Sequence, residues 1–368
     1  MTLRPNVSVV HYGPIDNQFV DTLEKGISVF SETPPSAGGA TPDTLYRTKK
    51  LQHVALLTIA SISDVPEVAE GCKSLLKHAR IDWLLLPDAC YLPGILPDPT
   101  AQLLHQNFVR VTVDPNGGLL AMNRMFDPLI AGHHILVNTR IAILLHSPET
   151  RLAQRPILDE VMEAYGLKPT GVMHVGANMG QEVSYYRDRN YGPVVLIEAN
   201  PDLAGYLLDK VKSDAGYYAV NVAATDQDGP ITLNITGNSQ GSSILAPSAE
   251  GIAEWGQDFN VQRQVTVPGR RLDGVVDDLK LELGAFSLLH LDIQGAEGMA
   301  LRGSKALLQH VEVVLSEINF TENYEGCSQI EEIDDLLEAA GFTRVAIDCT
   351  YSASWGDGIY VRNSLLPA

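Results

Sequence analysis

The clearest hydrophobic pattern in the chain lies near its middle. A short apolar run over residues 172–175 meets a turn with Gly176 and Gly180, an amphipathic segment follows, and a second apolar run over residues 194–197 ends at Glu198. This order predicts a strand, a glycine turn, a helix and a second strand. The glycines allow a tight turn close to a ligand, and the start of the helix directs unpaired N–H groups at it. Because a carboxylate after the second strand is placed to bind a ribose diol, we predict a nucleoside-cofactor site.

The glycine spacing distinguishes between two classes of cofactor. A dinucleotide fingerprint has a glycine two residues after the first one, where a pyrophosphate lies against bare backbone. Asn178 occupies that position here. A side chain there is easier to reconcile with S-adenosylmethionine, which has no phosphate. An ordinary strand–helix turn that keeps its glycines for close packing is the alternative.

Alternating apolar and amphipathic segments continue along the rest of the chain. After the glycine turn, apolar runs predict strands over residues 217–222, 287–292, 311–317, 343–349 and 358–361. Helical spacing predicts helices over residues 201–212, 297–310 and 331–340. This alternation implies an α/β fold with a doubly wound, mostly parallel sheet.

The first part of the chain shows the same rhythm more weakly. Residues 1–50 are irregular and carry turn and loop chemistry. Beyond them we predict strands over residues 53–60, 81–87 and 108–114 and helices over residues 65–78 and 99–107. The apolar run over residues 127–146 fits either type. We place a boundary between a smaller α/β N-terminal domain, residues 1–147, and a second domain, residues 148–368.

An internal repeat connects the two domains. Residues 55–79 align without a gap on residues 287–311, with matching Leu, Gly, Lys and His positions. Looser matches extend the alignment, in pairs, to residues 103–114 with 336–348 and 118–124 with 358–363. Asp292 corresponds to Ala60 in this alignment, so the polar residues are absent from the first copy. The N-terminal domain is therefore interpreted as a degenerate repeat of the back half of the second domain, with a role in substrate binding or oligomerisation. Chance leucine matches between two strand–helix–strand units are the alternative.

Composition narrows the range of partners. The chain has 26 Lys and Arg against 45 Asp and Glu, a formal net charge of −19, which repels phosphate backbones and predicts no nucleic-acid substrate. No apolar run approaches the length of a membrane span, and the first residues lack a secretory apolar region. The 4 cysteines form no CxxC pair, so we predict free thiols in the cytoplasm.

Acidic residues end two of the predicted strands. Asp292 and Glu317 would terminate neighbouring strands, close enough to share a proton, a water molecule or a divalent metal such as Mg²⁺. Asp292 could then orient or deprotonate a substrate hydroxyl. Glu297 is interpreted as a helix cap, and Asp226 as either a turn acid or a residue that faces an adenine.

A series of segments in residues 165–362 follows a recognisable order: HVGANMGQE, IEANP, NVAATDQDGPITL, GSSIL, RRLDGVV, LLHLDIQGAEGMALRGSKALL, VVLSEIN and AAGF. Together they resemble the FkbM-type S-adenosylmethionine-dependent methyltransferase family. The resemblance implies the class I methyltransferase fold, a Rossmann-like doubly wound sheet, with S-adenosyl-L-methionine as the cofactor. It also implies O-methylation of a small-molecule hydroxyl acceptor such as a sugar, a glycolipid or a polyketide. One departure is His174, where the family usually has an acid that contacts the methionine amino group.

These arguments give one set of candidate site residues. The expected catalytic residues are Asp292 and Glu317. The expected cofactor-binding residues are His174, Gly176, Ala177, Asn178, Gly180, Glu198, Ala199, Asn200, Asp226 and Asp292. Two other functions stay open, an NAD-dependent oxidoreductase and a non-catalytic scaffold that retains the cofactor pocket. Whether the chain forms a homo-oligomer also stays open.

Overall fold

The chain divides into two compact units, Met1–Arg151 and Leu152–Ala368. The structure is a computed structural model. It describes residues 157–348 and 354–366 and, before them, residues 8–12, 28–32, 54–59, 65–72, 75, 81–86, 96–97, 100, 108–113, 119–123 and 133–138. Among these residues no helix has the length and apolar character needed to cross a membrane.

The second unit is built on a seven-stranded sheet of order β10-β9-β8-β14-β15-β17-β16. Its strands are β8 (Val172–Val175), β9 (Val194–Ile197), β10 (Tyr217–Val220), β14 (Leu288–Leu291), β15 (Val313–Asn319), β16 (Phe342–Asp348) and β17 (Trp355–Arg362). β17 is antiparallel to both of its neighbours, and the other pairs are parallel. The predicted doubly wound, mostly parallel sheet is confirmed.

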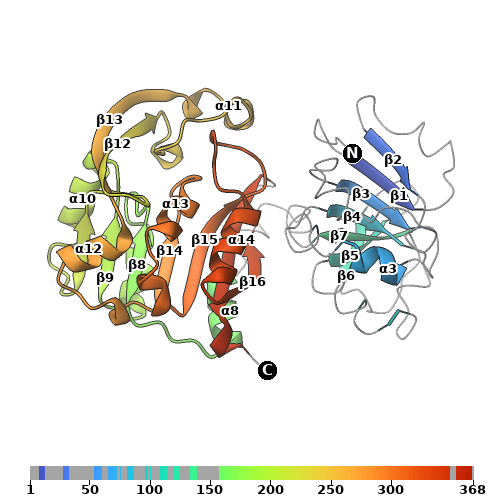
Figure 1. Ribbon diagram of the computed structural model, residues 1–368, viewed down its shortest axis with the longest axis horizontal. Coiled ribbons are helices and arrows are strands. Elements are labelled where there is room, and N and C mark those ends of the chain that lie inside the picture. The colour runs from blue at the N-terminus through green and yellow to red at the C-terminus, as the bar shows by residue number, and fades with distance from the viewer. Residues whose placement is uncertain are drawn as a thin grey trace. The chain divides into compact units, whose positions relative to one another are not determined.

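Helices cover both faces of this sheet. The helices of the unit are α8 (Ile157–Ala164), α9 (Val183–Asp188), α10 (Pro201–Val211), α11 (Ala249–Trp255), α12 (Leu272–Asp278), α13 (Glu297–Arg302) and α14 (Ile330–Ala339). Apolar residues of α8, α9 and α10 pack with one face of β8, β9, β14, β15 and β17 in a single core. Figure 1 shows α12, α13 and α14 in front of the sheet. Every residue of β8 and β9 is buried, which is why β9 is a continuous apolar run in the sequence and β8 is apolar except for His174.

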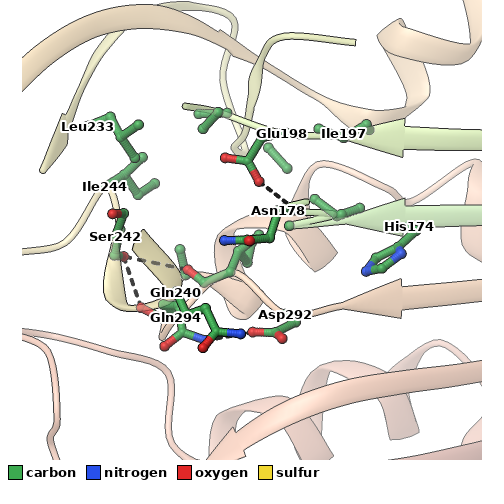
Figure 2. A pocket seen from close by; sticks show the side chains of 18 of the residues that line it. His174, Asn178, Ile197, Glu198, Leu233, Gln240, Ser242, Ile244, Asp292 and Gln294 are labelled. Atoms are coloured by element: carbon green, nitrogen blue, oxygen red, sulfur yellow. Dashed lines mark hydrogen bonds between the residues drawn. The ribbon is translucent and has the colours of Figure 1, made fainter. Parts of the chain in front are cut away.

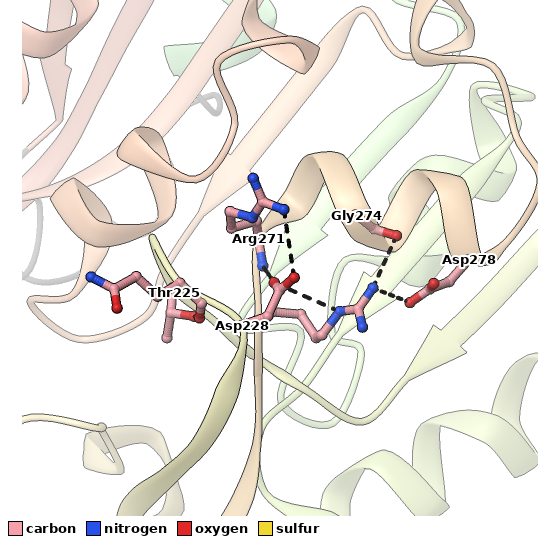
Figure 3. Close-up of polar contacts among 7 residues, drawn as sticks. Thr225, Asp228, Arg271, Gly274 and Asp278 are labelled. Carbon is pink, nitrogen blue, oxygen red and sulfur yellow. Dashed lines mark hydrogen bonds and ion pairs between the residues drawn. The ribbon is translucent and has the colours of Figure 1, made fainter.

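A small accessory sheet stands beside the carboxyl ends of the main strands. It pairs β11 (Ala223–Ala224) with β13 (Val261–Arg270), and β13 with the antiparallel β12 (Gly229–Thr236). Figure 3 shows how polar contacts fix the base of this sheet. The backbone N–H of Arg271 donates to Asp228 Oδ1 over 2.9 Å, and Arg270 Nη2 lies 2.5 Å from Asp278 Oδ2 on α12. These contacts attach the accessory sheet to the helix layer.

The first unit also contains a seven-stranded sheet, of order β2-β1-β3-β4-β7-β5-β6. Its strands are β1 (Ser8–Tyr12), β2 (Ser28–Glu32), β3 (Val54–Ile59), β4 (Ile81–Leu85), β5 (Phe108–Val113), β6 (Leu119–Asn123) and β7 (His133–Asn138), and α3 (Val65–Glu70) follows β3. The interpretation of residues 1–50 as irregular was wrong, because β1 and β2 lie there and both run parallel to their neighbours. The helix predicted over residues 99–107 lies outside the described residues except for Thr100.

Six strands of the first sheet repeat the connectivity of the second. β2-β1-β3-β4-β7-β5 correspond in order and direction to β9-β8-β14-β15-β17-β16, with β7 and β17 the antiparallel strands. The aligned pair of residues 118–124 and 358–363 does not fit this correspondence. β6 pairs with β5 at the sheet edge, and β7 occupies the place that β17 has in the second unit.

Candidate active site

A pocket of about 830 Å³, including the part open to solvent, lies at the carboxyl ends of β8, β9 and β14 and beside the accessory sheet. Figure 2 shows its labelled residues, with Leu233 and Ile244 on one side and His174 and Asp292 on the other. The residues that line it are His174, Val175, Gly176, Asn178, Gln181, Glu182, Ile197, Glu198, Ala199, Val222, Ala223, Ala224, Leu233, Ser239, Gln240, Ser242, Ser243, Ile244, Asp292, Ile293, Gln294 and Ala296.

The glycine turn brings bare backbone to the floor of this pocket. Gly176 has a φ of +87°, and a Cβ atom on it would lie 1.7 Å from the carbonyl oxygen of Asp292. Gly180 has a φ of +66° and Asn178 one of +45°. A side chain at residue 176 would therefore displace the end of β14, so the need for glycine comes from packing between strands as well as from the turn.

Glu198 holds the turn from the neighbouring strand. Its Oε2 accepts the backbone N–H of Asn178 over 2.8 Å, and its Oε1 accepts that of Asn200 over 2.7 Å. The side chain is 8% exposed and lines the pocket. Burial raises the pKa of Glu198, and the two N–H donors oppose that rise. Each oxygen keeps a further acceptor position, so the carboxylate can bind hydroxyl groups of a ligand.

Asp292 and Glu317 lie together on neighbouring strands. The parallel pairing of β14 with β15 places Leu291 opposite Ser316, and the two acids follow directly. Gln294 bridges them, since its Nε2 donates to Asp292 Oδ1 over 2.6 Å and to Glu317 Oε2 over 2.8 Å. The Tyr324 hydroxyl donates to Gln294 Oε1 over 2.9 Å, which fixes the orientation of the amide.

The two acids differ in their access to the pocket. Asp292 is open to it, whereas Glu317 is 4% exposed and does not line it. Withdrawal from water raises the pKa of both carboxyls, and for Glu317 the nearby charges of Glu297 and Asp292 raise it further. Because two carboxylates this close repel each other, the pair favours one shared proton.

Glu297 sits behind this pair and is completely buried. Its Oε1 accepts the backbone N–H groups of Ile293 and Gly295 over 2.9 and 3.3 Å, and its Oε2 has no hydrogen-bond partner. Burial raises its pKa to about 7. The interpretation as a helix cap needs correction, because Glu297 begins α13 but holds the turn between Asp292 and the helix, and no side chain caps α13.

His174 is a neutral residue in the pocket wall. It is 2% exposed and stacks on His290, with ring centroids 4.1 Å apart. The Tyr186 hydroxyl lies 3.1 Å from the Nδ1 atom of each imidazole. Burial, aided by the neighbouring His290, holds the pKa of His174 well below its usual range, and burial lowers the pKa of His290 to about 4. Neither ring therefore carries charge at neutral pH.

A family model of known proteins matches the part of the chain that contains this pocket. Residues 174–344 match the family model of the methyltransferase FkbM domain. These residues form an FkbM methyltransferase domain. Together with the strand order of the second unit, this match confirms the class I methyltransferase fold that the sequence predicted. A search of curated protein sequences finds no match to the chain.

Solved structures similar to the chain are distant. Magnesium protoporphyrin IX methyltransferase (ChlM) from Synechocystis PCC 6803 with bound SAM is 11% identical, and the match covers 58% of this chain and 79% of that one, with a TM-score of 0.30. A SAM-dependent methyltransferase from Aquifex aeolicus is 12% identical over 59% and 98% of the chains, with a TM-score of 0.29. Streptococcus pneumoniae Sp1610, a putative tRNA (m1A22) methyltransferase, is 10% identical over 57% and 71%, with a TM-score of 0.31.

The FkbM domain brings most of the sequence-predicted residues together. Those that line the pocket are His174, Gly176, Asn178, Glu198, Ala199 and Asp292. Others lie near it without lining it: Ala177 and Gly180 in the glycine turn, Asn200 at the N-cap of α10, and Glu317 behind Gln294. Asp226 does not line the pocket either, and its Oδ2 lies 3.5 Å from Arg302 Nε.

Several pocket residues were not singled out from the sequence. Gln181 and Glu182 follow the glycine turn directly, and the HVGANMGQE segment contained them without assigning them a role. Gln294 and the segment Ser239–Ile244 also line the pocket. Among the residues that the structure describes, no group of three or more His, Cys, Asp or Glu side chains is arranged to hold a metal ion.

Proposed function

We propose that the FkbM domain transfers a methyl group from S-adenosyl-L-methionine to a hydroxyl group of a small molecule such as a sugar, a glycolipid or a polyketide. One observation carries this proposal. The glycine turn lies between a ribose-type acceptor, Glu198, on one strand and an acid open to the pocket, Asp292, on another. A cofactor held on the first side would present its reactive part near the second.

The chemistry of the pocket fits this cofactor. Glu198 has acceptor positions left for a ribose diol, and the close approach at Gly176 leaves bare backbone beside it. Apolar side chains at one end offer a slot for a purine: Val222, Ala223, Leu233 and Ile244. When bound, S-adenosylmethionine supplies an electrophilic methyl group on a sulfonium. NAD fits less well, since Asn178 stands where a pyrophosphate needs bare backbone.

Asp292 is the residue we assign as the base. Gln294 donates to its Oδ1, and the carboxylate keeps acceptor positions for the proton of the acceptor hydroxyl. A raised pKa brings this carboxyl closer to the range in which a base is effective at neutral pH. Glu317 shares the proton of the pair and keeps Gln294 in place. Positioning of the hydroxyl supplies much of the remaining rate enhancement.

Other properties of the chain follow as parts of the proposal. We assign residues 1–147 a role in acceptor binding or in homo-oligomer formation, and we expect the protein to act in the cytoplasm. The net charge of −19 supports a small-molecule acceptor over a nucleic acid.

The test combines binding with turnover. Isothermal titration should show that S-adenosylhomocysteine binds and NAD does not. The acceptor can be sought among small molecules that copurify with the protein, by mass spectrometry and transfer of an isotope-labelled methyl group.

Asp292→Asn should then lower turnover by roughly 10²–10⁴ while S-adenosylhomocysteine affinity changes only a few-fold. EDTA should abolish wild-type turnover, with rescue by Mg²⁺, only if the reaction uses a metal. Full turnover in Asp292→Asn would remove the base from the proposal, and NAD binding alone would favour the oxidoreductase.

A further inference from the structure

We propose that Glu182 is the carboxylate that binds the ammonium group in the amino-acid part of S-adenosylmethionine. The inference rests on the proposed function, because it concerns the same pocket. Three observations carry it: the polarity of the pocket along its length, the lack of another partner for Glu182, and the charges that surround this residue.

The pocket changes from apolar to acidic along its length. Leu233 and Ile244 lie at one side and His174 and Asp292 at the other, as Figure 2 shows. Glu198 stands between the two ends and suits a ribose, so a purine would extend toward Leu233 and Ile244. The amino-acid part, which carries one ammonium and one carboxylate group, would then extend toward the acidic end. No lysine or arginine is among the residues described as lining the pocket.

Among the acids described as lining this pocket, Glu182 differs in that no other residue donates a hydrogen bond to its carboxylate. It precedes α9 directly and is partly buried in the pocket wall. Within the described part of the chain, its carboxylate is bonded only by its own backbone N–H. By contrast, Glu198 is bonded to two backbone N–H groups and Asp292 to Gln294.

The charged groups around Glu182 favour a cation next to it. Burial raises the pKa of Glu182, and the charge of Asp292 adds to that rise. Asp357 on β17 and Tyr186 on α9 also interact with it electrostatically. Lys210 on α10 is the nearby cation, but its Nζ donates to the carbonyl oxygens of Met179 and Gly180 over 2.8 and 2.6 Å.

His174 cannot form an ion pair with the ammonium group of the ligand, so a carboxylate is needed for that contact. Its neutral ring does not repel an ammonium group, but it cannot offer a charge either. A ligand ammonium bonded to Glu182 would offset the repulsion that the charge of Asp292 exerts on this carboxylate and would satisfy its unused oxygen atoms. Glu182 therefore binds the ammonium group, and Asp292 stays available to the methyl acceptor.

A pair of ligands isolates this contact. S-adenosylhomocysteine carries the amino-acid part, whereas 5′-methylthioadenosine has the same adenosine and thioether without it. In isothermal titration of the full chain, Glu182→Gln should weaken S-adenosylhomocysteine roughly tenfold and change 5′-methylthioadenosine by less than about twofold. Asp188→Asn, at the other end of α9, is the matched control and should change neither. Glu198→Gln should weaken both ligands.

The pH dependence gives a second readout. Protonation of Glu182 removes the partner of the ammonium group, so S-adenosylhomocysteine affinity should fall as the pH drops through the raised pKa of Glu182. Relative to 5′-methylthioadenosine, that dependence should be absent in Glu182→Gln and kept in Glu182→Asp.

The outcomes separate this inference from the proposed function. Suppose the wild-type protein binds both ligands, and Glu182→Gln weakens them equally or weakens neither. That result overturns the role of Glu182 and leaves the cofactor assignment standing. A wild-type protein that binds neither ligand overturns both. A selective loss of S-adenosylhomocysteine affinity, with an unchanged melting temperature, supports the ammonium contact.

Discussion

Removal of the Glu198 carboxylate should affect cofactor binding and the glycine turn together. The sequence predicts that Glu198→Ala leaves the fold intact, because the side chain serves only the ribose. The structure adds two backbone N–H groups, of Asn178 and Asn200, that donate to the same carboxylate over 2.8 and 2.7 Å. A truncation therefore removes the ribose partner and leaves two N–H donors unpaired.

The magnitudes follow from these contacts. Loss of the charge-assisted bonds to the ribose should cost about 2 kcal/mol, or a roughly 30-fold weaker affinity for S-adenosylhomocysteine. Each buried N–H left without a partner costs about 1–3 kcal/mol. Water can reach Asn178 from the pocket, whereas Asn200 is buried, so we expect the free energy of unfolding to fall by about 2 kcal/mol rather than by the full sum.

Two assays distinguish the contributions. Isothermal titration measures the affinity, and hydrogen exchange measures the protection of the Asn178 and Asn200 amides. Glu198→Gln keeps one carbonyl acceptor, so its free energy of unfolding should fall by about half as much as that of Glu198→Ala. Asp209→Asn, on the exposed side of α10 with 77% of its side chain accessible, is the control and should change neither quantity. Wild-type affinity in Glu198→Ala would refute the ribose assignment, and full protection of both amides would refute the account of the turn.

The remaining predictions concern the acids, the glycine turn and the number of sites. Burial raises the pKa of Asp357 from 3.8 to about 8, so the folded state binds the extra proton between these values. The contribution of Asp357 to the free energy of unfolding should then fall as pH rises toward 8, by at most about 1.4 kcal/mol per pH unit, and level off above pH 8. Denaturant titration across pH measures this dependence. The Asp357→Asn variant should not show this contribution. Gly176→Ala should lose about 3 kcal/mol or more of stability and most cofactor affinity because of the clash with Asp292, whereas Gly205→Ala, with no atom within 4 Å of the added Cβ, should raise the melting temperature slightly. Titration of the full chain should give one S-adenosylhomocysteine per chain, and a stoichiometry of two would contradict the loss of chemistry in the first unit.

The elements around the glycine turn were predictable because local physics decides them. Buried parallel strands require apolar runs, and these identified β8 and β9 with their bounds. Parallel pairing also brings residues in register on adjacent strands together, which predicted that Asp292 and Glu317 lie close to each other. Only Asp292 follows its strand, however, because β15 continues past Glu317 to Asn319. The role of each acid stays a prediction until the variants are measured.

Other parts of the site depend on contacts between distant segments, which the sequence pattern does not report. Gln294, which bridges the two acids, has a backbone φ of +58°, a conformation that glycine adopts more readily. The Ser243 hydroxyl from the accessory-sheet segment donates to the Gln294 carbonyl oxygen over 2.9 Å and supports this conformation. Similarly, Glu297 has the sequence signature of a first-turn acid, and only the folded turn shows that it accepts two N–H groups. The helix-cap interpretation followed from the local sequence alone. It was wrong because the contacts of Glu297 arise only in the folded turn.

The bounds of matching strands and helices in the two units agree with the alignment of the internal repeat. β3 ends at Ile59 and β14 at Leu291, and α3 begins at Val65 and α13 at Glu297, so both pairs keep the constant offset of the alignment. Val65 and Glu297 are both fully buried, but a valine side chain cannot accept the two N–H groups that Glu297 holds. The side-chain acceptor that Glu297 supplies in the second unit therefore has no counterpart at residue 65. Retained strand order, with a buried valine in the place of the acceptor Glu297, is the pattern expected when a copy is kept for its fold and not for a cofactor.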